Sequence, residues 1–144
     1  MRGLRTLLHA LAVLSLLTLA NGAETQAARV RVLFLGDQGH HQPRVRFGEL
    51  QPVLERAGVD LEYSEDVGRL SLSGLSDKDA LIVYANIDEL PASSERALLA
   101  WVQSGKGFVP LHCASFCFRN SDEYVRLVGA QFERHGFEHL PRTS

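Results

Sequence analysis

The 144-residue sequence has little cysteine and no large excess of either charge. Its two cysteines are too few for the disulfide framework of a small secreted scaffold. Lys and Arg number 15 against 17 Asp and Glu, for a formal net charge of −2, so the chain lacks the basic surplus typical of nucleic-acid-binding proteins. With 45% hydrophobic and 22% charged residues, the composition is that of a globular protein with room for one domain.

The first 22 residues have the three-part layout of a secretory signal peptide. A short positive stretch at residues 1–5 precedes an uncharged, Leu- and Ala-rich run at 7–20, and small residues follow where a signal peptidase cleaves. The run is shorter than the roughly 20 residues that span a bilayer as a helix, although an uncleaved membrane anchor is the alternative. We expect cleavage after residue 22, export to the periplasm or the medium, and no stable membrane insertion afterwards.

Strand and helix patterns alternate in the rest of the chain. Residues 23–29 form a polar lead-in, and residues 30–144 form the expected domain. Apolar or alternating runs predict strands, and apolar residues at helical spacing predict helices that end at glycines. Pro52 should kink or split the first helix, and Pro110 should keep the last strand short or only partly paired. The expected strands cover 30–35, 59–63, 80–85 and 108–112, and the expected helices cover 43–57, 91–104 and 122–128.

This order predicts an α/β fold with a parallel sheet between two layers of helices, because each right-handed crossover lays its helix back on the sheet. Functional groups in such folds collect at the carboxyl ends of the strands, near the point where strand order reverses. Polar residues follow three of the expected strands. They are Asp37, His40 and His41 after the first, Asn86 and Asp88 after the third, and His112, Cys113 and Ser115 after the fourth.

The histidines are the strongest candidates for chemistry. Imidazoles brought together on one rim bind metals or transfer protons near neutral pH. His135 is a further candidate, because a turn at Gly136 suits the same rim. Each histidine also has a structural interpretation: a solvated loop side chain for His40 and His41, or a core histidine bonded to a backbone carbonyl for His112.

Cys113 and Cys117 admit several interpretations. Their spacing is not the C-x-x-C of a redox pair, and an i,i+4 pair aims its Cβ atoms poorly for a disulfide. With His135 and His139 they resemble a zinc-finger ligand set, but the gap between the pairs is too long and Gly136 interrupts the helix a finger needs. Two ordinary thiols beside a pocket is the simplest interpretation.

A cysteine nucleophile is a separate hypothesis. Residues 109–115 form a strand followed by a turn, the placement of a nucleophile elbow. The glycines that usually allow so tight a turn are absent on both sides of Cys113 and Ser115. No spacing in the chain identifies the base that such a nucleophile needs.

Four segments resemble ThuA-like (trehalose-utilisation) domains: residues 32–36 with a loop histidine, 81–86, 97–112 and 124–135. The resemblance implies a class I glutamine amidotransferase-like, flavodoxin-like fold and a link to carbohydrate metabolism. His112 stands where amidotransferases carry their nucleophilic cysteine, and Cys113 comes one residue later, so glutamine hydrolysis should not be carried over. ThuA-like domains are generally longer, so we expect the fold to be incomplete at the C-terminus.

These observations lead to one expected function and two alternatives. We expect an exported ThuA-like domain that binds or processes a carbohydrate in a histidine-lined pocket. The first alternative is a non-catalytic sugar- or protein-binding module, and the second is a cysteine-dependent hydrolase or amidotransferase. The expected catalytic residues, which are also candidate ligands of a divalent metal, are His41, His112 and His135. The expected substrate contacts are Asp37, His40, Asn86, Cys113 and Ser115.

Overall fold

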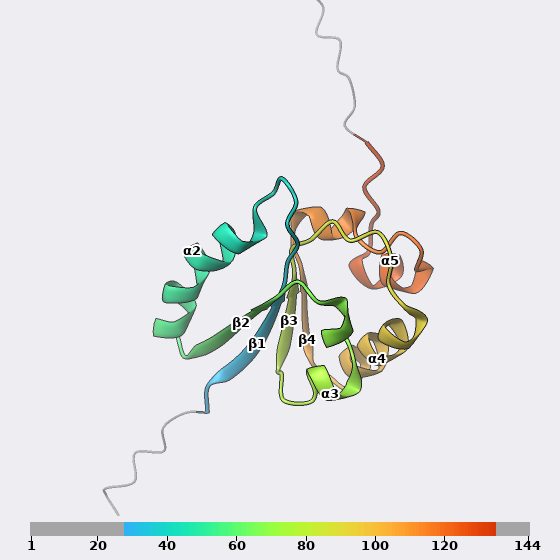
Figure 1. Ribbon diagram of the computed structural model, residues 1–144. Helices are drawn as coiled ribbons and strands as arrows, with labels where there is room; N and C mark the ends of the chain where they lie inside the picture. Colours follow the sequence, from blue (N-terminus) through green and yellow to red (C-terminus); the bar gives the residue numbers. More distant parts are fainter. Residues whose placement is uncertain (1–27, 135–144) are drawn as a thin grey trace, which may run out of the picture.

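The computed structural model describes residues 28–134, which contain a four-stranded parallel sheet (Figure 1). Strand β1 (Val30–Leu35) pairs with β2 (Val59–Ser64) on one side and β3 (Ala80–Val83) on the other, and β4 (Gly107–Pro110) pairs with β3. The order is therefore β2-β1-β3-β4. Because the chain leaves β1 toward β2 and then returns past it to β3, strand order reverses between β1 and β3, where such folds form a crevice.

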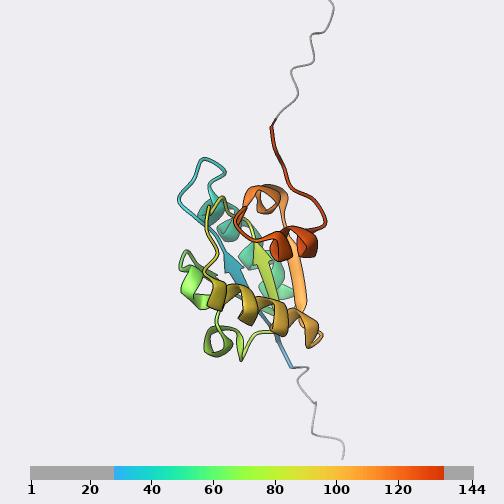
Figure 2. The ribbon, with the colours of Figure 1, turned by 90° about the vertical axis from the view of Figure 1, so that its right-hand side faces the viewer.

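Helices cover both faces of this sheet, which confirms the predicted α/β architecture. Figures 1 and 2 show α2 on one face, and α4 and α5 on the other with the short α3. Two 3₁₀ turns, η1 and η2, complete the described elements. The bounds are α2 Pro43–Arg56, η1 Val67–Arg69, α3 Leu72–Leu75, α4 Ala92–Gln103, η2 His112–Phe116 and α5 Asp122–Val128.

The alternation of side chains along β1 gives the protein two cores. Leu33 and Leu35 are fully buried in a core beneath α3, α4 and α5, together with Trp101 and Tyr124. Phe34 points the other way, into a smaller core beneath α2. A strand apolar on both faces is what a parallel sheet with two helical layers requires. This holds for residues 32–35, whereas Val30 at the start of β1 is 45% exposed.

Two proline effects differ in outcome. Helix α2 continues through Pro52, so of the two expected effects the split is wrong, while the kink stays a prediction. Pro52 is exposed on the outer side of the helix, where water can solvate the carbonyl that loses its partner. Pro110 ends a four-residue strand at the sheet edge, as expected of a residue without a backbone N–H.

The end of β4 and the segment before β3 depart from the predicted elements. His112 does not close the strand, as the sequence suggested, but begins η2. The polar stretch between β2 and β3 holds η1 and α3, which apolar periodicity did not reveal because each is a single turn capped by a polar side chain. Ser71 caps α3 by accepting a hydrogen bond from the Gly74 N–H. Leu75 of α3 is fully buried.

The polar lead-in is attached to the domain at its last residues. The Arg29 guanidinium contacts Asp60 at 2.6 Å and donates to the carbonyls of Glu55 and Val59, each at 3.2 Å. The proposed signal peptide at residues 1–22 lies outside the described residues. No helix within residues 28–134 is long and apolar enough to cross a membrane.

Candidate functional site

The loops that follow β1, β3 and β4 enclose a cavity of about 530 Å³, which we call the edge cavity. It lies at the carboxyl ends of the strands, where the reversal of strand order predicts a crevice. Its polar lining comes from the three loops together. These lining residues are His40 and His41 after β1, Asn86 after β3, and His112, Cys113 and Ser115 after β4.

Three imidazoles meet at this cavity although they are far apart in the sequence. The ring centroids of His40 and His41 lie 3.9 Å apart, and those of His41 and His112 lie 4.6 Å apart in an edge-to-face arrangement. The Tyr84 ring stacks against His112 with centroids 6.1 Å apart. Burial lowers the pKa of His41, and the neighbouring His40 and His112 lower it further. At neutral pH His41 therefore favours the uncharged form that accepts a proton or a metal.

The backbone of His112 adopts a left-handed conformation at the turn after β4, with φ 46°. This φ is costly for a residue with a Cβ, and such residues gather at functional sites. The tight turn therefore forms without the glycines whose absence argued against an elbow. The Ser115 hydroxyl donates to the His112 carbonyl at 3.1 Å, so one role of Ser115 is to hold this turn.

Asp37 organises the site from behind. One carboxylate oxygen accepts the Gly39 N–H at 2.6 Å, and the other accepts the N–H of Asn86. Asp37 therefore ties the loop after β1 to the loop after β3, and it is absent from the lining of the edge cavity. Its expected role as a substrate contact stays a prediction, while the geometry gives it a positioning role.

Backbone hydrogen bonds hold the loop at Asn86, and Asn86 lines the edge cavity. The Asn86 N–H donates to Asp37. The next residue, Ile87, donates its N–H to the Cys117 sulfur at 3.4 Å, and its carbonyl accepts the Phe118 N–H at 2.7 Å. Within the described residues, the Asn86 Oδ1 atom is buried and accepts no hydrogen bond. An orphaned buried acceptor costs stability and calls for an explanation.

The two cysteines are free, buried thiols. Burial raises the pKa of Cys113 to about 11, and the negative charge of Asp37 adds to this effect. Burial raises the pKa of Cys117 to about 12. Both shifts are opposite to those of activated cysteine nucleophiles, whose pKa is lowered. The thiols are therefore protonated near neutral pH.

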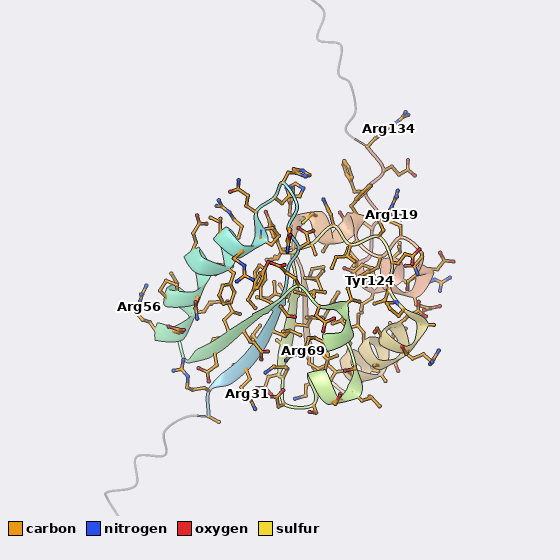
Figure 3. The ribbon with its side chains drawn as sticks, viewed as in Figure 1. Arg31, Arg56, Arg69, Arg119, Tyr124 and Arg134 are labelled. Carbon is orange, nitrogen blue, oxygen red and sulfur yellow. The ribbon has the colours of Figure 1, made fainter. Side chains whose placement is uncertain are left out.

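An aromatic wall completes the cavity, and sequence analysis did not single it out. Phe116 and Phe132 line the edge cavity with ring centroids 6.0 Å apart, edge to face. The Phe132 N–H donates to the Ser115 carbonyl at 2.9 Å, which fixes this strip of chain beside η2. The Arg119 guanidinium lies 4.4 Å from the Phe116 ring centroid, at the same end of the molecule as Arg134 (Figure 3). Scattered phenylalanines in loops carry no periodic signal.

The expected metal ligands are only partly brought together. His41 and His112 are neighbours, while His135 lies outside the described residues, as does His139 of the zinc-finger interpretation. Within residues 28–134 no group of three or more His, Cys, Asp or Glu side chains is arranged to hold a metal ion. The described residues alone therefore do not fit a three-ligand centre, and no chemistry is routed through a metal below.

These features define the chain as a doubly wound α/β protein with a candidate ligand cavity at its topological switch point. The family model for ThuA, trehalose utilisation, matches residues 31–143. The chain belongs to this family. No curated protein matches it.

Two solved structures share the fold. Both are described as ThuA-like: one from Parabacteroides merdae ATCC 43184, at 24% identity and TM-score 0.56, and one from Bacteroides uniformis ATCC 8492, at 19% identity and TM-score 0.55. The alignments cover 67% and 76% of this chain but 37% and 47% of the two solved chains. The present chain thus matches less than half the length of either structure.

Proposed function

We propose that this protein is an exported ThuA-like domain that binds or processes a carbohydrate in the edge cavity. The observation that carries the proposal is the convergence of His40, His41 and His112 on a cavity that Asn86 also lines. The buried amide oxygen of Asn86 has no hydrogen-bond partner among the described residues. A sugar offers many hydroxyl groups, and each can donate to or accept from such side chains. The match to the trehalose-utilisation family favours a carbohydrate over other polyhydroxylated ligands.

The lining limits which carbohydrate chemistry the cavity supports. Glycoside hydrolases of the common type need two carboxyl groups flanking the scissile bond. Among the described residues that line the edge cavity, none is Asp or Glu. General acid–base chemistry would therefore fall to the imidazoles, with His41 as the base because its lowered pKa keeps it unprotonated near neutral pH.

Calorimetric titration of the purified chain with trehalose and with glucose tests the proposal. We expect binding of at least one sugar, weakened at least tenfold in His41→Ala and unchanged in the control Glu123→Gln on the surface of α5. His112→Asn is the second test variant, because asparagine tolerates a positive φ and preserves the turn. Equal binding by wild type and both histidine variants would contradict the proposal.

The same samples separate the alternatives. A sugar that binds but is recovered unchanged, as followed by NMR of the mixture, would favour a non-catalytic binding module. Turnover abolished by iodoacetamide would revive the cysteine-dependent hydrolase. We expect iodoacetamide to react slowly at pH 8 with the folded protein and rapidly with the urea-unfolded chain, because the pKa of Cys113 is raised.

A further inference from the structure

The orphaned oxygen of Asn86 is the strongest unexplained feature of the edge cavity. A second asparagine, Asn120 between η2 and α5, provides the contrast. The Asn120 amide accepts the Leu90 N–H at 2.9 Å and donates to the Leu90 carbonyl at 3.1 Å. Both ends of this amide therefore have hydrogen-bond partners, and they hold Leu90 in place. The Asn86 Oδ1 atom is buried and accepts nothing from the described residues.

The position of Asn86 is fixed without help from its side chain. The Asn86 N–H donates to the Asp37 carboxylate. The Ile87 N–H donates to the Cys117 sulfur, and the Ile87 carbonyl accepts the Phe118 N–H. Replacing the amide therefore leaves the backbone of this loop with its hydrogen bonds. The acceptor is costly to the fold, the loop does not need it, and it belongs to a residue that lines the cavity. This combination is typical of a preorganised ligand contact.

The charges of the lining side chains restrict which ligands can reach this acceptor. No Lys, Arg, Asp or Glu occurs among the described residues that line it. The nearby Asp37 carboxylate is engaged by two backbone N–H groups. The Cys113 thiol is protonated, since its pKa is raised to about 11. Apart from the three imidazoles, none of these lining side chains offers a charge opposite to that of a charged ligand at neutral pH, and the lowered pKa of His41 favours its uncharged form. Burial of a charge without compensation is unfavourable.

We propose that Asn86 is a specificity-determining residue whose Oδ1 accepts a hydrogen bond from a hydroxyl group of an uncharged sugar bound against the Phe116 and Phe132 wall. This inference rests on the proposed function and names the ligand class within it. The cavity selects neutral sugars over sugar acids, because a carboxylate would find no Lys or Arg among the described lining residues. Amino sugars are disfavoured because their ammonium group would lose its hydration.

Titration of three variants with glucose, gluconate and glucosamine at pH 7 tests the assignment. Asn86→Leu keeps the volume and removes the acceptor, and we expect it to bind glucose at least tenfold more weakly while its unfolding temperature is unchanged or higher. Asn86→Asp keeps an acceptor and adds a negative charge, and we expect it to reverse the preference so that glucosamine binds more tightly than glucose. Asn120→Ala is the control, expected to lower the unfolding temperature without changing the order of preference among the three ligands.

The outcomes separate the two proposals. Glucose binding by wild type that is unchanged in Asn86→Leu overturns the role of Asn86 and leaves the proposed function intact. An unfolding temperature that falls in Asn86→Leu as much as in Asn120→Ala also overturns it, because the amide would then be structural. Wild-type protein that binds gluconate as tightly as glucose overturns the charge selectivity. Absence of wild-type binding to any sugar, trehalose included, overturns the proposed function and this inference together.

Discussion

The two ends of the sheet treat polar groups in opposite ways. Near the amino ends of β1, β3 and β4, charges form ion pairs: Arg31 with Asp77, the largely buried Lys78 with Asp77 and with Glu62 of β2, and Lys106 with Asp79. At the carboxyl ends of the same strands, six polar residues line the edge cavity, and the buried amide oxygen of one of them, Asn86, has no partner among the described residues. Figure 3 shows Arg31 and Arg119 at these opposite ends. We call the end with these ion pairs the closed end and the end with the edge cavity the open end.

The largest expected effect concerns the group that supports the open end. Asp37→Ala removes the acceptor for the Gly39 and Asn86 N–H groups, and we expect it to lower the free energy of unfolding by about 3 kcal/mol, since hydrogen bonds to a charged group are worth about 1.5–3 kcal/mol each. Asp66→Ala is the control, because Asp66 accepts one N–H in an exposed turn. Its expected cost is about 1 kcal/mol. Equal losses in urea denaturation would show that Asp37 has no special role.

At the closed end, the burial of Lys78 is the feature to test. Its side chain is 5% exposed, and its ammonium lies 2.6 Å from Glu62. We expect Lys78→Met to lower the free energy of unfolding by about 1.5 kcal/mol, because the aliphatic packing remains while two carboxylates lose a buried partner. Lys106→Met removes an exposed pair and should cost less than about 0.5 kcal/mol. Sugar binding should be unchanged in both variants. Weaker binding in either variant would contradict the view that the closed end contributes only to stability.

The strained turn at His112 predicts that a glycine variant is more stable than an alanine variant at this position. His112→Gly relieves the positive φ, whereas His112→Ala retains it. Left-handed backbone costs a residue with a Cβ roughly 1 kcal/mol, so we expect the glycine variant to be about 1 kcal/mol more stable than the alanine variant in urea denaturation. The two variants should lose sugar binding alike. An alanine variant as stable as the glycine variant would show that the turn stores no strain.

The smallest expected effect is a pH dependence from Glu62 at the closed end. Hydrogen bonds from Arg69 and Lys78 lower the pKa of Glu62 from its usual 4.5 to about 2. The folded state therefore binds this proton less readily than the unfolded state, so the stabilisation is complete above pH 4.5 and is lost as the pH falls toward 2. Because the Glu62 side chain is 40% exposed, we expect less than about 1 kcal/mol. Subtracting the stability curve of Glu62→Gln from that of wild type should isolate it, and parallel curves would contradict the ion pairs.

Sequence patterns predicted the sheet better than they predicted the cavity. The apolar runs of β1 and β3 and the glycine at the end of α5 are local signals, and each marked its element to within a few residues. Topology then put the three strand ends on one rim, which was enough to bring His40, His41 and His112 together. What the pattern did not contain is the direction of each side chain.

Asp37 and Phe116 illustrate that missing information. Both follow strands on the same rim, yet the Asp37 carboxylate turns back to two backbone N–H groups while the Phe116 ring lines the cavity. The difference depends on contacts with residues about fifty positions away, such as the Asn86 N–H, and no local periodicity encodes them. The positive φ of His112 likewise had no signal, because glycine, its usual marker, is absent from that turn.

The central place of β1 in the sheet has a consequence for biosynthesis. A ribosome releases the chain from its N-terminus, so β1, α2 and β2 are available to pair once residue 64 has emerged. The cavity needs the loop after β3, the η2 turn and Phe132, which are translated later. The pairing of β1 with β2 can therefore precede the formation of the edge cavity, and a sugar has no means of guiding that early step of folding.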